Sequence, residues 1–214
     1  MDDTQTVFVV DDDEGVREGL SMLLESVGLA CETYASSLGF LDKFDPLRRG
    51  CLVLDIRMPR MTGLELQEKL NQLKSAIPII FITGHGDVQM AVEAMRRGAL
   101  DFIRKPFREQ ELLERINEAL TVEAGKHKRL FERKAMLDKI AALSDREREV
   151  FERVADGEMN KVIAIDLGIS ERTVEVHRSQ VMKKLGVRTL AQLVRLNIDA
   201  SMPLRESVSG GSPK

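Results

Sequence analysis

The feature that most constrains this chain is a repeated alternation of short apolar runs and amphipathic helical patterns over its first 120 residues. The apolar runs predict strands at 6–10, 30–34, 51–54, 77–82 and 101–103. Most are continuously apolar, which is typical of parallel strands covered on both faces. Between them apolar residues recur at helical spacing. The pattern predicts an α/β domain with a doubly wound five-stranded parallel sheet of order 2-1-3-4-5.

The rest of the chain has a different organisation, and it divides the protein into parts. We expect the α/β domain to occupy residues 1–122. Residues 123–142 are charged and helix-prone, so they predict a helical linker, with Gly125 as a candidate break. Residues 143–200 predict a small all-α domain. The small polar residues 201–214 predict a disordered tail.

Helix-start signals support the all-α part. Capping-box spacing joins Ser144 to Glu147 and Thr189 to Gln192, and Ser170 can cap the helix that follows it. The expected helices span about 145–156, 160–167, 171–185 and 190–198. No internal repeat is found.

Composition excludes some classes of protein. No apolar run approaches the roughly 20 residues that span a bilayer, so a membrane protein is excluded. The start Met1-Asp2-Asp3 lacks the positive charge of a secretory signal, and Cys31 and Cys51 lie in apolar segments. We therefore expect a cytoplasmic protein with two buried thiols and no zinc site.

Charge is distributed unevenly along the chain. Residues 1–122 carry a net charge of −7 and residues 123–214 a net charge of +4. A basic second half favours nucleic acid as a partner, although a solvated charged face explains a charge of this size about as well.

Polar residues with related chemistry stand at the ends of four expected strands. Asp11 and Asp12 follow the first strand, Asp55 the third, Thr83 the fourth and Lys105 the fifth. In a sheet of this order, the carboxyl ends of strands one and three border the crevice where ligands bind. Three carboxylates there need a cation, and an all-oxygen set suits Mg²⁺. Lys105 and Thr83 add charge and a hydroxyl, so the set predicts a site for a phosphoryl group on one of the carboxylates.

Two alternative interpretations of these residues are less consistent with the sequence. The acidic run at 11–14 alone could be a helix start favoured by the helix dipole, but that does not explain Asp55 or Lys105. A phosphohydrolase that passes through an aspartyl-phosphate needs a general acid two residues after its nucleophile. Arg57 stands there, and a guanidinium cannot transfer protons at neutral pH. An aspartyl-phosphate should therefore persist, and no enzyme is expected. His85 is assigned no role.

At these residues the chain resembles a known family, the receiver domains of bacterial response regulators, over residues 5–121. The resemblance is carried by Val9-Val10-Asp11-Asp12-Asp13, by Leu52-Val53-Leu54-Asp55-Ile56-Arg57-Met58-Pro59 with Gly63, by Phe81-Ile82-Thr83-Gly84-His85-Gly86 and by Lys105-Pro106-Phe107.

The resemblance implies a role for each of these positions. Asp55 would accept phosphate from a sensor histidine kinase. Asp12 and Asp55, with the Arg57 carbonyl, would hold Mg²⁺, and Asp11 would contact it through water. Thr83 and Lys105 would bind the phosphoryl oxygens, Phe102 would fill the place of the aromatic switch residue, and the Lys105–Pro106 peptide would be cis.

The second half contains the spacing of a helix-turn-helix. Ala164, Gly168 and Val174 supply a small contact residue, a turn glycine and an apolar anchor. If Val174 points inward, the outward face of helix 171–185 suits a major-groove reader. That face consists of Arg172, Glu175, Val176, Ser179 and Lys183. Arg178, Lys161, Lys184 and Arg188 flank it as candidate phosphate contacts.

Over about residues 140–200 the chain is similar to the LuxR-type DNA-binding domain, although a helical bundle with a solvated face is the alternative. The motifs are Leu143-Ser144-Asp145-Arg146-Glu147-Arg148-Glu149-Val150, Asn160-Lys161-Val162-Ile163-Ala164, Leu167-Gly168-Ile169-Ser170 and Thr173-Val174-Glu175-Val176-His177-Arg178. With the receiver this is the NarL/FixJ architecture. The motif at Thr173–Arg178 and the residues at 83–87 are similar to the FixJ branch. Many relatives outside that branch carry Lys at the place of Glu175, which leaves the base preference open.

Together these observations predict a two-component response regulator whose phosphorylation controls binding to promoter DNA and activates transcription. The expected partners are a sensor histidine kinase, promoter DNA, RNA polymerase and, after phosphorylation, a second copy of the chain. Dimerisation is expected at helix 87–97 and strand 101–104, where Arg96, Arg97 and Arg104 stand beside Asp87, Glu93 and Asp101. The alternatives are a phosphorylation-independent DNA-binding regulator with a vestigial receiver and a protein–protein adaptor.

Overall fold

The computed structural model of the chain describes residues 4–84 and 88–202. The chain divides into two compact units, Met1–His127 and Lys128–Lys214, and each is described by itself. Most of the expected tail at 201–214, together with His85 and Asp87, lies outside the described residues. No helix within the described ranges is both long enough and apolar enough to cross a membrane.

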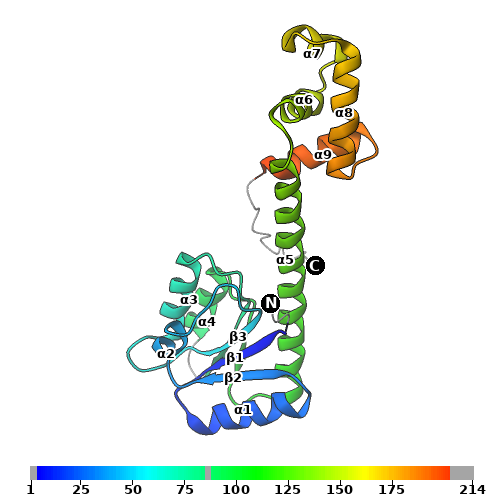
Figure 1. Ribbon diagram of the computed structural model, residues 1–214. Helices are drawn as coiled ribbons and strands as arrows, with labels where there is room; N and C mark the ends of the chain where they lie inside the picture. The colour runs from blue at the N-terminus through cyan, green and yellow to red at the C-terminus, as the bar shows by residue number, and fades with distance from the viewer. Residues whose placement is uncertain (1–3, 85–87, 203–214) are drawn as a thin grey trace, which may run out of the picture. The chain divides into compact units, whose positions relative to one another are not determined.

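The first unit is built on a parallel sheet whose order β2-β1-β3-β4-β5 confirms the predicted topology. Figure 1 labels β2, β1 and β3 lying side by side in this order. Its strands are β1 (Thr6–Val10), β2 (Ala30–Tyr34), β3 (Gly50–Asp55), β4 (Ile79–Thr83) and β5 (Asp101–Arg104). In the central pairing, Thr6 lies opposite Gly50 and Val10 lies opposite Leu54. Because both strands end at the same level, Asp11 and Asp55 stand at the same edge of the sheet.

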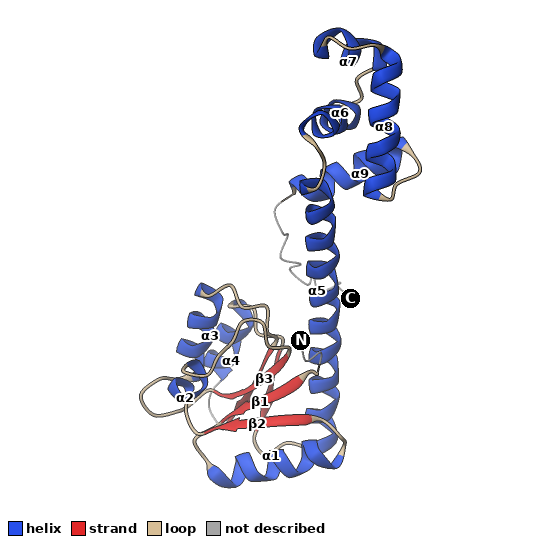
Figure 2. Cartoon of the chain, in the orientation of Figure 1, coloured by secondary structure: helices blue, strands red, loops and turns tan. Residues whose placement is uncertain are grey.

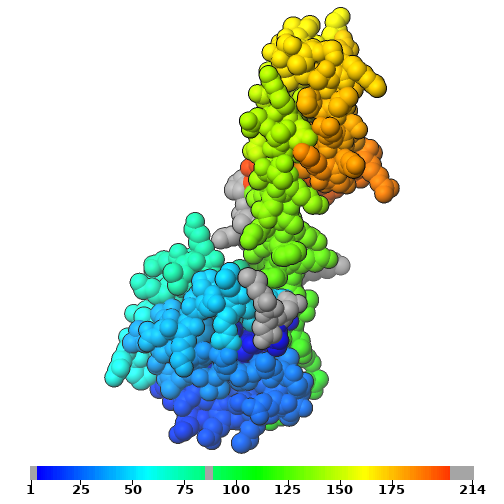
Figure 3. All heavy atoms as spheres, viewed as in Figure 1, coloured from blue at the N-terminus to red at the C-terminus, as the bar shows by residue number. Residues whose placement is uncertain are grey.

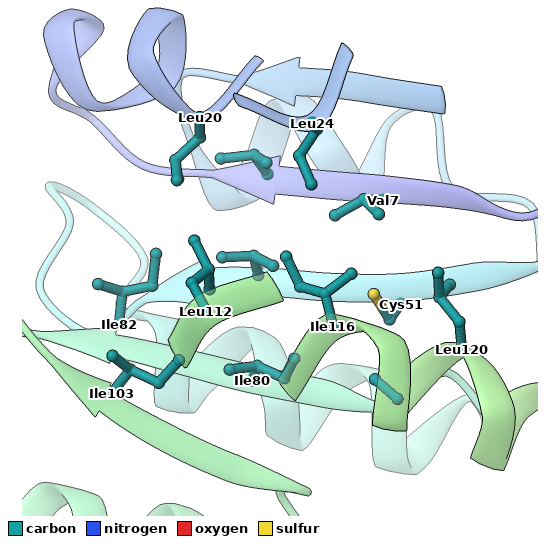
Figure 4. Packing of buried hydrophobic residues seen from close by; sticks show 13 residues of the cluster. Val7, Leu20, Leu24, Cys51, Ile80, Ile82, Ile103, Leu112, Ile116 and Leu120 are labelled. Atoms are coloured by element: carbon teal, nitrogen blue, oxygen red, sulfur yellow. The ribbon is translucent and has the colours of Figure 1, made fainter. Parts of the chain in front are cut away.

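Helices cover both faces of this sheet (Figure 2). They are α1 (Glu14–Ser26), α2 (Ser37–Leu41), α3 (Gly63–Gln72), α4 (Val88–Arg96) and α5 (Glu109–Ala141). On one face, α1 and α5 pack against alternate strand residues around Leu24, Ile80 and Ile116 (Figure 4). On the other, α2, α3 and α4 pack around Phe40, Phe81 and Leu66. The two apolar layers explain why the strands lack polar alternation.

The last helix of this unit is longer than the sequence suggested. The expected linker at 123–142 lies almost wholly within α5, and Gly125 does not interrupt it, because one glycine costs a helix only about 1 kcal/mol. Glu123 is buried and accepts a hydrogen bond from Gln5. The first compact unit ends at His127, and the predicted domain end at Val122 lies in the same helix.

The two cysteines differ in their environments. Cys51 on the central strand β3 is buried, whereas Cys31 is only partly buried, so the expectation of two buried thiols is wrong for Cys31. The reason is that β2 is an outer strand of the sheet. Both are free thiols.

The second unit contains α6 (Asp145–Ala155), α7 (Asn160–Leu167), α8 (Glu171–Leu185) and α9 (Leu190–Ser201). Both expected capping boxes are present, and the Ser170 hydroxyl accepts a hydrogen bond from the Thr173 backbone N–H. Val150, Phe151, Ile163, Val174 and Leu193 belong to its apolar core. Helix α9 continues about one turn beyond the expected end.

Candidate functional site

Three carboxylates meet at the carboxyl edge of the sheet, as predicted. Asp11 and Asp12 follow β1 and Asp55 ends β3, and one oxygen of each lies within 4.8 Å of the others. Asp11 is fully buried, Asp55 is nearly buried and Asp12 is exposed. The cluster thus extends from a fully buried carboxylate to one that is open to solvent.

Lys105 reaches this pocket from the turn after β5. Its Nζ lies 2.7 Å from Asp11 Oδ2 and 3.6 Å from Asp55 Oδ1. The Lys105 backbone N–H donates to the Thr83 carbonyl at 2.7 Å, and the Lys105–Pro106 peptide is cis, as the family resemblance implied. The Lys105 ammonium therefore lies beside two of the three carboxylates.

The charges of the pocket are not balanced. Burial raises the pKa of Asp55 to about 6; Lys105 opposes this shift, and the charges of Asp11 and Asp12 add to it. Burial acts to lower the pKa of Lys105, but its hydrogen bond to Asp11 and the nearby carboxylates outweigh this, and that pKa is raised. Three carboxylates against one ammonium leave an excess of negative charge, which a divalent cation would neutralise.

Gly63 shapes the backbone next to Asp55, a role that the sequence motif did not reveal. A Cβ at Gly63 would lie 2.2 Å from the Asp55 carbonyl oxygen and 3.0 Å from the Phe81 ring. The Gly63 N–H donates to the Ile56 carbonyl at 2.9 Å. A second unpredicted contact is that of Arg17, whose guanidinium donates to the Asp11 carbonyl at 2.8 Å. These contacts fix the two loops that carry Asp11 and Asp55.

The remaining predicted pocket residues lie around this centre. Thr83 ends β4 and is buried, and its hydroxyl donates to the Gly84 carbonyl at 3.4 Å. Phe102 lies on β5 opposite Phe81 in register and is exposed. Arg57 has an exposed side chain.

The charged face of α4 and β5 carries ion pairs within the chain. Arg97 is paired with Glu93 at 2.7 Å and with Glu68 at 3.2 Å, and Asp101 is paired with Arg115 at 2.8 Å. These partly exposed pairs lie within one chain, and the predicted pairing across a two-fold axis stays a prediction. Exposed residues of this face, among those that the structure describes, include Val92, Met95, Arg96, Phe102 and Arg104.

The second unit contains the predicted helix-turn-helix. Ala164 of α7 and Val174 of α8 are buried in its core. Gly168 adopts a φ of 65° after α7, a left-handed conformation that glycine reaches at least cost. With Val174 inward, the outward residues of α8 are exposed as expected: Arg172, Glu175, Val176, Ser179 and Lys183. Arg172 and Glu175 are paired at 3.2 Å.

The flanking cations have different surroundings. Lys161 and Arg188 are exposed, whereas Arg178 is partly buried and donates to Asn160 Oδ1 at 3.2 Å. Arg178 and Arg188, but not Lys161, line a shallow groove together with Asn160, Glu175, Ser179, Met182 and Val187. Asn160 was not predicted from the sequence as a contact residue. Only its hydrogen bond with Arg178 identifies it as a candidate.

Lys184, predicted as a phosphate contact, also has a partner within the domain. Its Nζ lies 2.6 Å from a carboxylate oxygen of the buried Glu147, which also accepts hydrogen bonds from the Ser144 backbone N–H and hydroxyl. Lys184 holds α8 to the start of α6, because a buried carboxylate needs a counter-ion. In contrast to Lys161 and Arg188, Lys184 therefore has a structural role within the domain.

The fold and the two sites define the class of this protein: a receiver-type α/β domain with an acidic pocket, followed by a helix-turn-helix domain. Residues 7–117 match the family of response regulator receiver domains, and residues 141–197 match the luxR family of bacterial regulatory proteins.

Individual relatives agree with both matches. The transcriptional regulatory protein FixJ of Azorhizobium caulinodans is 46% identical over 202 residues, covering 94% of this chain and 96% of the relative. The response regulator protein TmoT of Ectopseudomonas mendocina is 44% identical, covering 91% and 89%. The solved structure of the response regulator StyR has a TM-score of 0.83 at 48% identity, covering 91% and 98%.

This chain belongs to the response regulators of two-component systems that carry a LuxR-type DNA-binding domain. It is a transcription regulator, and the family predicted from the sequence is confirmed. The relatives are named as regulators of transcription or response, in agreement with the prediction that the chain is not an enzyme.

Proposed function

We propose that Asp55 accepts a phosphoryl group from a sensor histidine kinase. Accessibility is the observation that favours Asp55 over the other two carboxylates. Asp11 is closer to Lys105 but is fully buried. Asp12 is open to solvent but has no described contact with Lys105. Asp55 alone among the three combines contact with the ammonium, at 3.6 Å, and a side chain that is partly exposed, at 11%.

The reaction assigned to Asp55 is a transfer between two proteins. A carboxylate oxygen of Asp55 attacks the phosphorus of a phosphohistidine, the P–N bond breaks, and the kinase imidazole leaves with the bonding pair. With a pKa of about 6, Asp55 is mostly ionised at neutral pH and is ready to attack. Lys105 then exchanges its carboxylate contacts for a phosphoryl oxygen, and the Thr83 hydroxyl donates to another.

Mg²⁺ is the cofactor that this pocket fits best. The donors are all oxygen, and they lie within 4.8 Å of one another. Asp12, Asp55 and the Arg57 carbonyl would hold the ion, with Asp11 in contact through water. When bound, it would neutralise charge on the phosphoryl oxygens.

Labelling with a small phosphoryl donor tests the acceptor. Wild-type protein with Mg²⁺ should take up one phosphoryl group, and Asp55→Asn or chelation of the metal should abolish the label. Asp42→Asn, which alters an exposed carboxylate elsewhere in the same domain, should leave it unchanged. Labelling that survives Asp55→Asn would exclude Asp55 as the acceptor. Full DNA binding by Asp55→Asn would favour the alternative of a vestigial receiver.

For DNA recognition we propose that α8 reads bases with Arg172, Glu175, Val176, Ser179 and Lys183, while Lys161, Arg178 and Arg188 contact phosphates. Arg172→Ala or Val176→Ala should lower the preference for particular bases, at a cost of about 1–3 kcal/mol for each specific contact. Arg188→Ala should weaken binding to all sequences alike and reduce its salt dependence. Unchanged specificity in both α8 variants would show that another element reads the bases.

The proposed response to phosphorylation is dimerisation, because a single helix in one major groove gives limited affinity. The exposed residues of α4 and β5, Val92, Met95, Arg96, Phe102 and Arg104, are the candidate contact. Two bound domains would then activate transcription with RNA polymerase in the cytoplasm. If the phosphorylated protein sediments as a monomer at micromolar concentration while its DNA affinity rises, dimerisation is not the mechanism.

A further inference from the structure

Asp12 differs from the other two carboxylates of the pocket in how its side chain is held. Asp11 accepts hydrogen bonds from the Asp13 backbone N–H at 2.9 Å and from Lys105 at 2.7 Å. The Lys105 ammonium also lies 3.6 Å from Asp55. The Asp12 side chain is exposed, and within residues 4–84 and 88–202 it has no described hydrogen bond or ion pair. The direction of the Asp12 carboxylate therefore depends on the backbone that carries it.

Arg17 holds the peptide unit that joins Asp11 to Asp12. Its Nη1 donates to the Asp11 carbonyl oxygen at 2.8 Å. That oxygen and the Asp12 N–H belong to one planar peptide unit, so a donor that fixes the oxygen also fixes the plane from which the Asp12 side chain departs. The Asp11 N–H is itself bonded to the Tyr34 carbonyl at 3.2 Å. The backbone that leads into Asp12 is therefore held by two hydrogen bonds.

The helix that carries Arg17 is a fixed base for this contact. Leu20 and Leu24 of α1 are buried, and both point towards Val7 of β1 (Figure 4). Figure 3 shows the blue segment that contains α1 at the surface of the first unit. Arg17 is partly buried, and its backbone N–H donates to the Asp13 carbonyl at 3.2 Å. Its guanidinium thus reaches back to the loop from a helix that is packed on the sheet.

The charge of Arg17 does not favour a metal ion. A guanidinium stays protonated in proteins, and it repels a divalent cation nearby. Loss of this charge alone would therefore tighten cation binding. Loss of a positioning contact acts in the opposite direction, because hydrogen bonds behind the ligands of a metal raise its affinity by about 10–100-fold. The sign of the change in affinity separates the two effects.

We propose that Arg17 is a positioning residue for the divalent cation, because it holds Asp12, through the Asp11 carbonyl, where the Asp12 carboxylate can reach the ion. The proposal rests on the proposed Mg²⁺ site. In this assignment Arg17 contacts neither the ion nor the phosphoryl group. It acts on the exposed ligand, whereas Asp11 and Asp55 have side-chain contacts of their own. A carboxylate that is already in place loses less conformational freedom when the ion binds.

Binding of Mn²⁺ to the unphosphorylated full-length protein tests this role. Free Mn²⁺ is measured by electron paramagnetic resonance, and Mg²⁺ is added as a competitor, since both ions prefer oxygen ligands. Arg17→Met removes the donor and the charge, and it should weaken binding of both ions about tenfold. Arg17→Lys keeps a donor and should recover most of this loss. Arg108→Met, which removes an exposed cation three residues after Lys105, is the matched control and should not weaken binding.

A double variant shows whether Arg17 acts through Asp12. Asp12→Asn alone should weaken Mn²⁺ binding, and addition of Arg17→Met should cause no further loss, because the carboxylate that Arg17 positions is already absent. Losses that add in the double variant would overturn the proposal, as would an Arg17→Lys variant that binds no better than Arg17→Met. Urea unfolding followed by Tyr34 fluorescence checks that each variant is folded. Arg17→Gln, a shorter neutral side chain, is a second variant with the same expected loss.

The outcomes separate the inference from the function on which it rests. If Asp12→Asn binds Mn²⁺ as tightly as wild type, the proposed metal site is wrong and the inference fails with it. If Asp12→Asn weakens binding but Arg17→Met and Arg17→Gln bind as tightly as wild type or more tightly, the inference alone is wrong.

Discussion

Replacement of Glu123 by Gln should destabilise the receiver although the residue lies where the sequence predicted a linker. The Glu123 carboxylate accepts hydrogen bonds from Gln5 Nε2 at 2.6 Å and from Arg49 Nε and Nη2 at 3.2 Å each. The paired side chains of Arg49 and Glu123 are only 14% and 10% exposed. The substitution keeps the size of the side chain but removes the charge that is paired with Arg49.

The magnitude follows from this burial. Breaking a buried ion pair by removing one partner costs about 3–5 kcal/mol. The substituted glutamine side chain would retain an oxygen that accepts one hydrogen bond, and the pair lies at the edge of the sheet, so we expect about 2–3 kcal/mol. Glu118→Gln, on the same helix, is the matched control. Its pair with Arg115 is exposed, and its loss should cost below about 1 kcal/mol.

In the full-length protein, tyrosine fluorescence can follow the unfolding of the receiver alone. Tyr34 on β2 is the single tyrosine, and the chain has no tryptophan. With a denaturant dependence of about 2 kcal/mol per molar urea, Glu123→Gln should lower the midpoint of the Tyr34 transition by about 1–1.5 M. If its midpoint shifts no more than that of Glu118→Gln, the buried pair does not stabilise the receiver, and the assignment of residues 123–127 to this domain loses its support.

Two further predictions concern particular contacts. Gly63→Ala should slow phosphoryl labelling of Asp55 at least tenfold, about 1.4 kcal/mol in the barrier, because its Cβ would lie 2.2 Å from the Asp55 carbonyl oxygen. Gly19→Ala is the control, since a Cβ at Gly19 would have no atom within 4 Å, and it should not slow labelling. Equal labelling rates in the two variants would contradict this prediction. The pKa of Glu147 is lowered to about 2, chiefly by the hydrogen bond from Lys184, so its stabilisation should be complete above about pH 4.5 and lost as the pH falls towards 2. Urea unfolding followed by circular dichroism should therefore show Glu147→Gln as less stable than wild type at pH 7 and the difference shrinking between about pH 4.5 and 2.5; a difference that stays constant would refute the assignment.

The sequence by itself determined the sheet and the place of its acidic pocket. Continuous apolar runs specify strands buried on both faces, and the first polar residue after each run marks where a strand leaves the sheet. Because the carboxyl ends of parallel strands share one edge, the meeting of Asp11, Asp55, Thr83 and Lys105 could be predicted from their positions in the chain. Helix starts were equally local, since a capping box is formed by residues three apart.

The tertiary structure decided which charges are free and which are already paired. Lys184 was predicted as a phosphate contact, and its ammonium is paired with Glu147, 37 residues away in the chain. Arg97 and Asp101 were expected at a dimer contact and are paired within the receiver. Glu123 was placed in a linker and is buried against Arg49, 74 residues away. A periodic pattern specifies which face of a helix is exposed. The partner of a charged side chain, in contrast, depends on packing between elements that are distant in sequence. Only the folded chain brings those partners together.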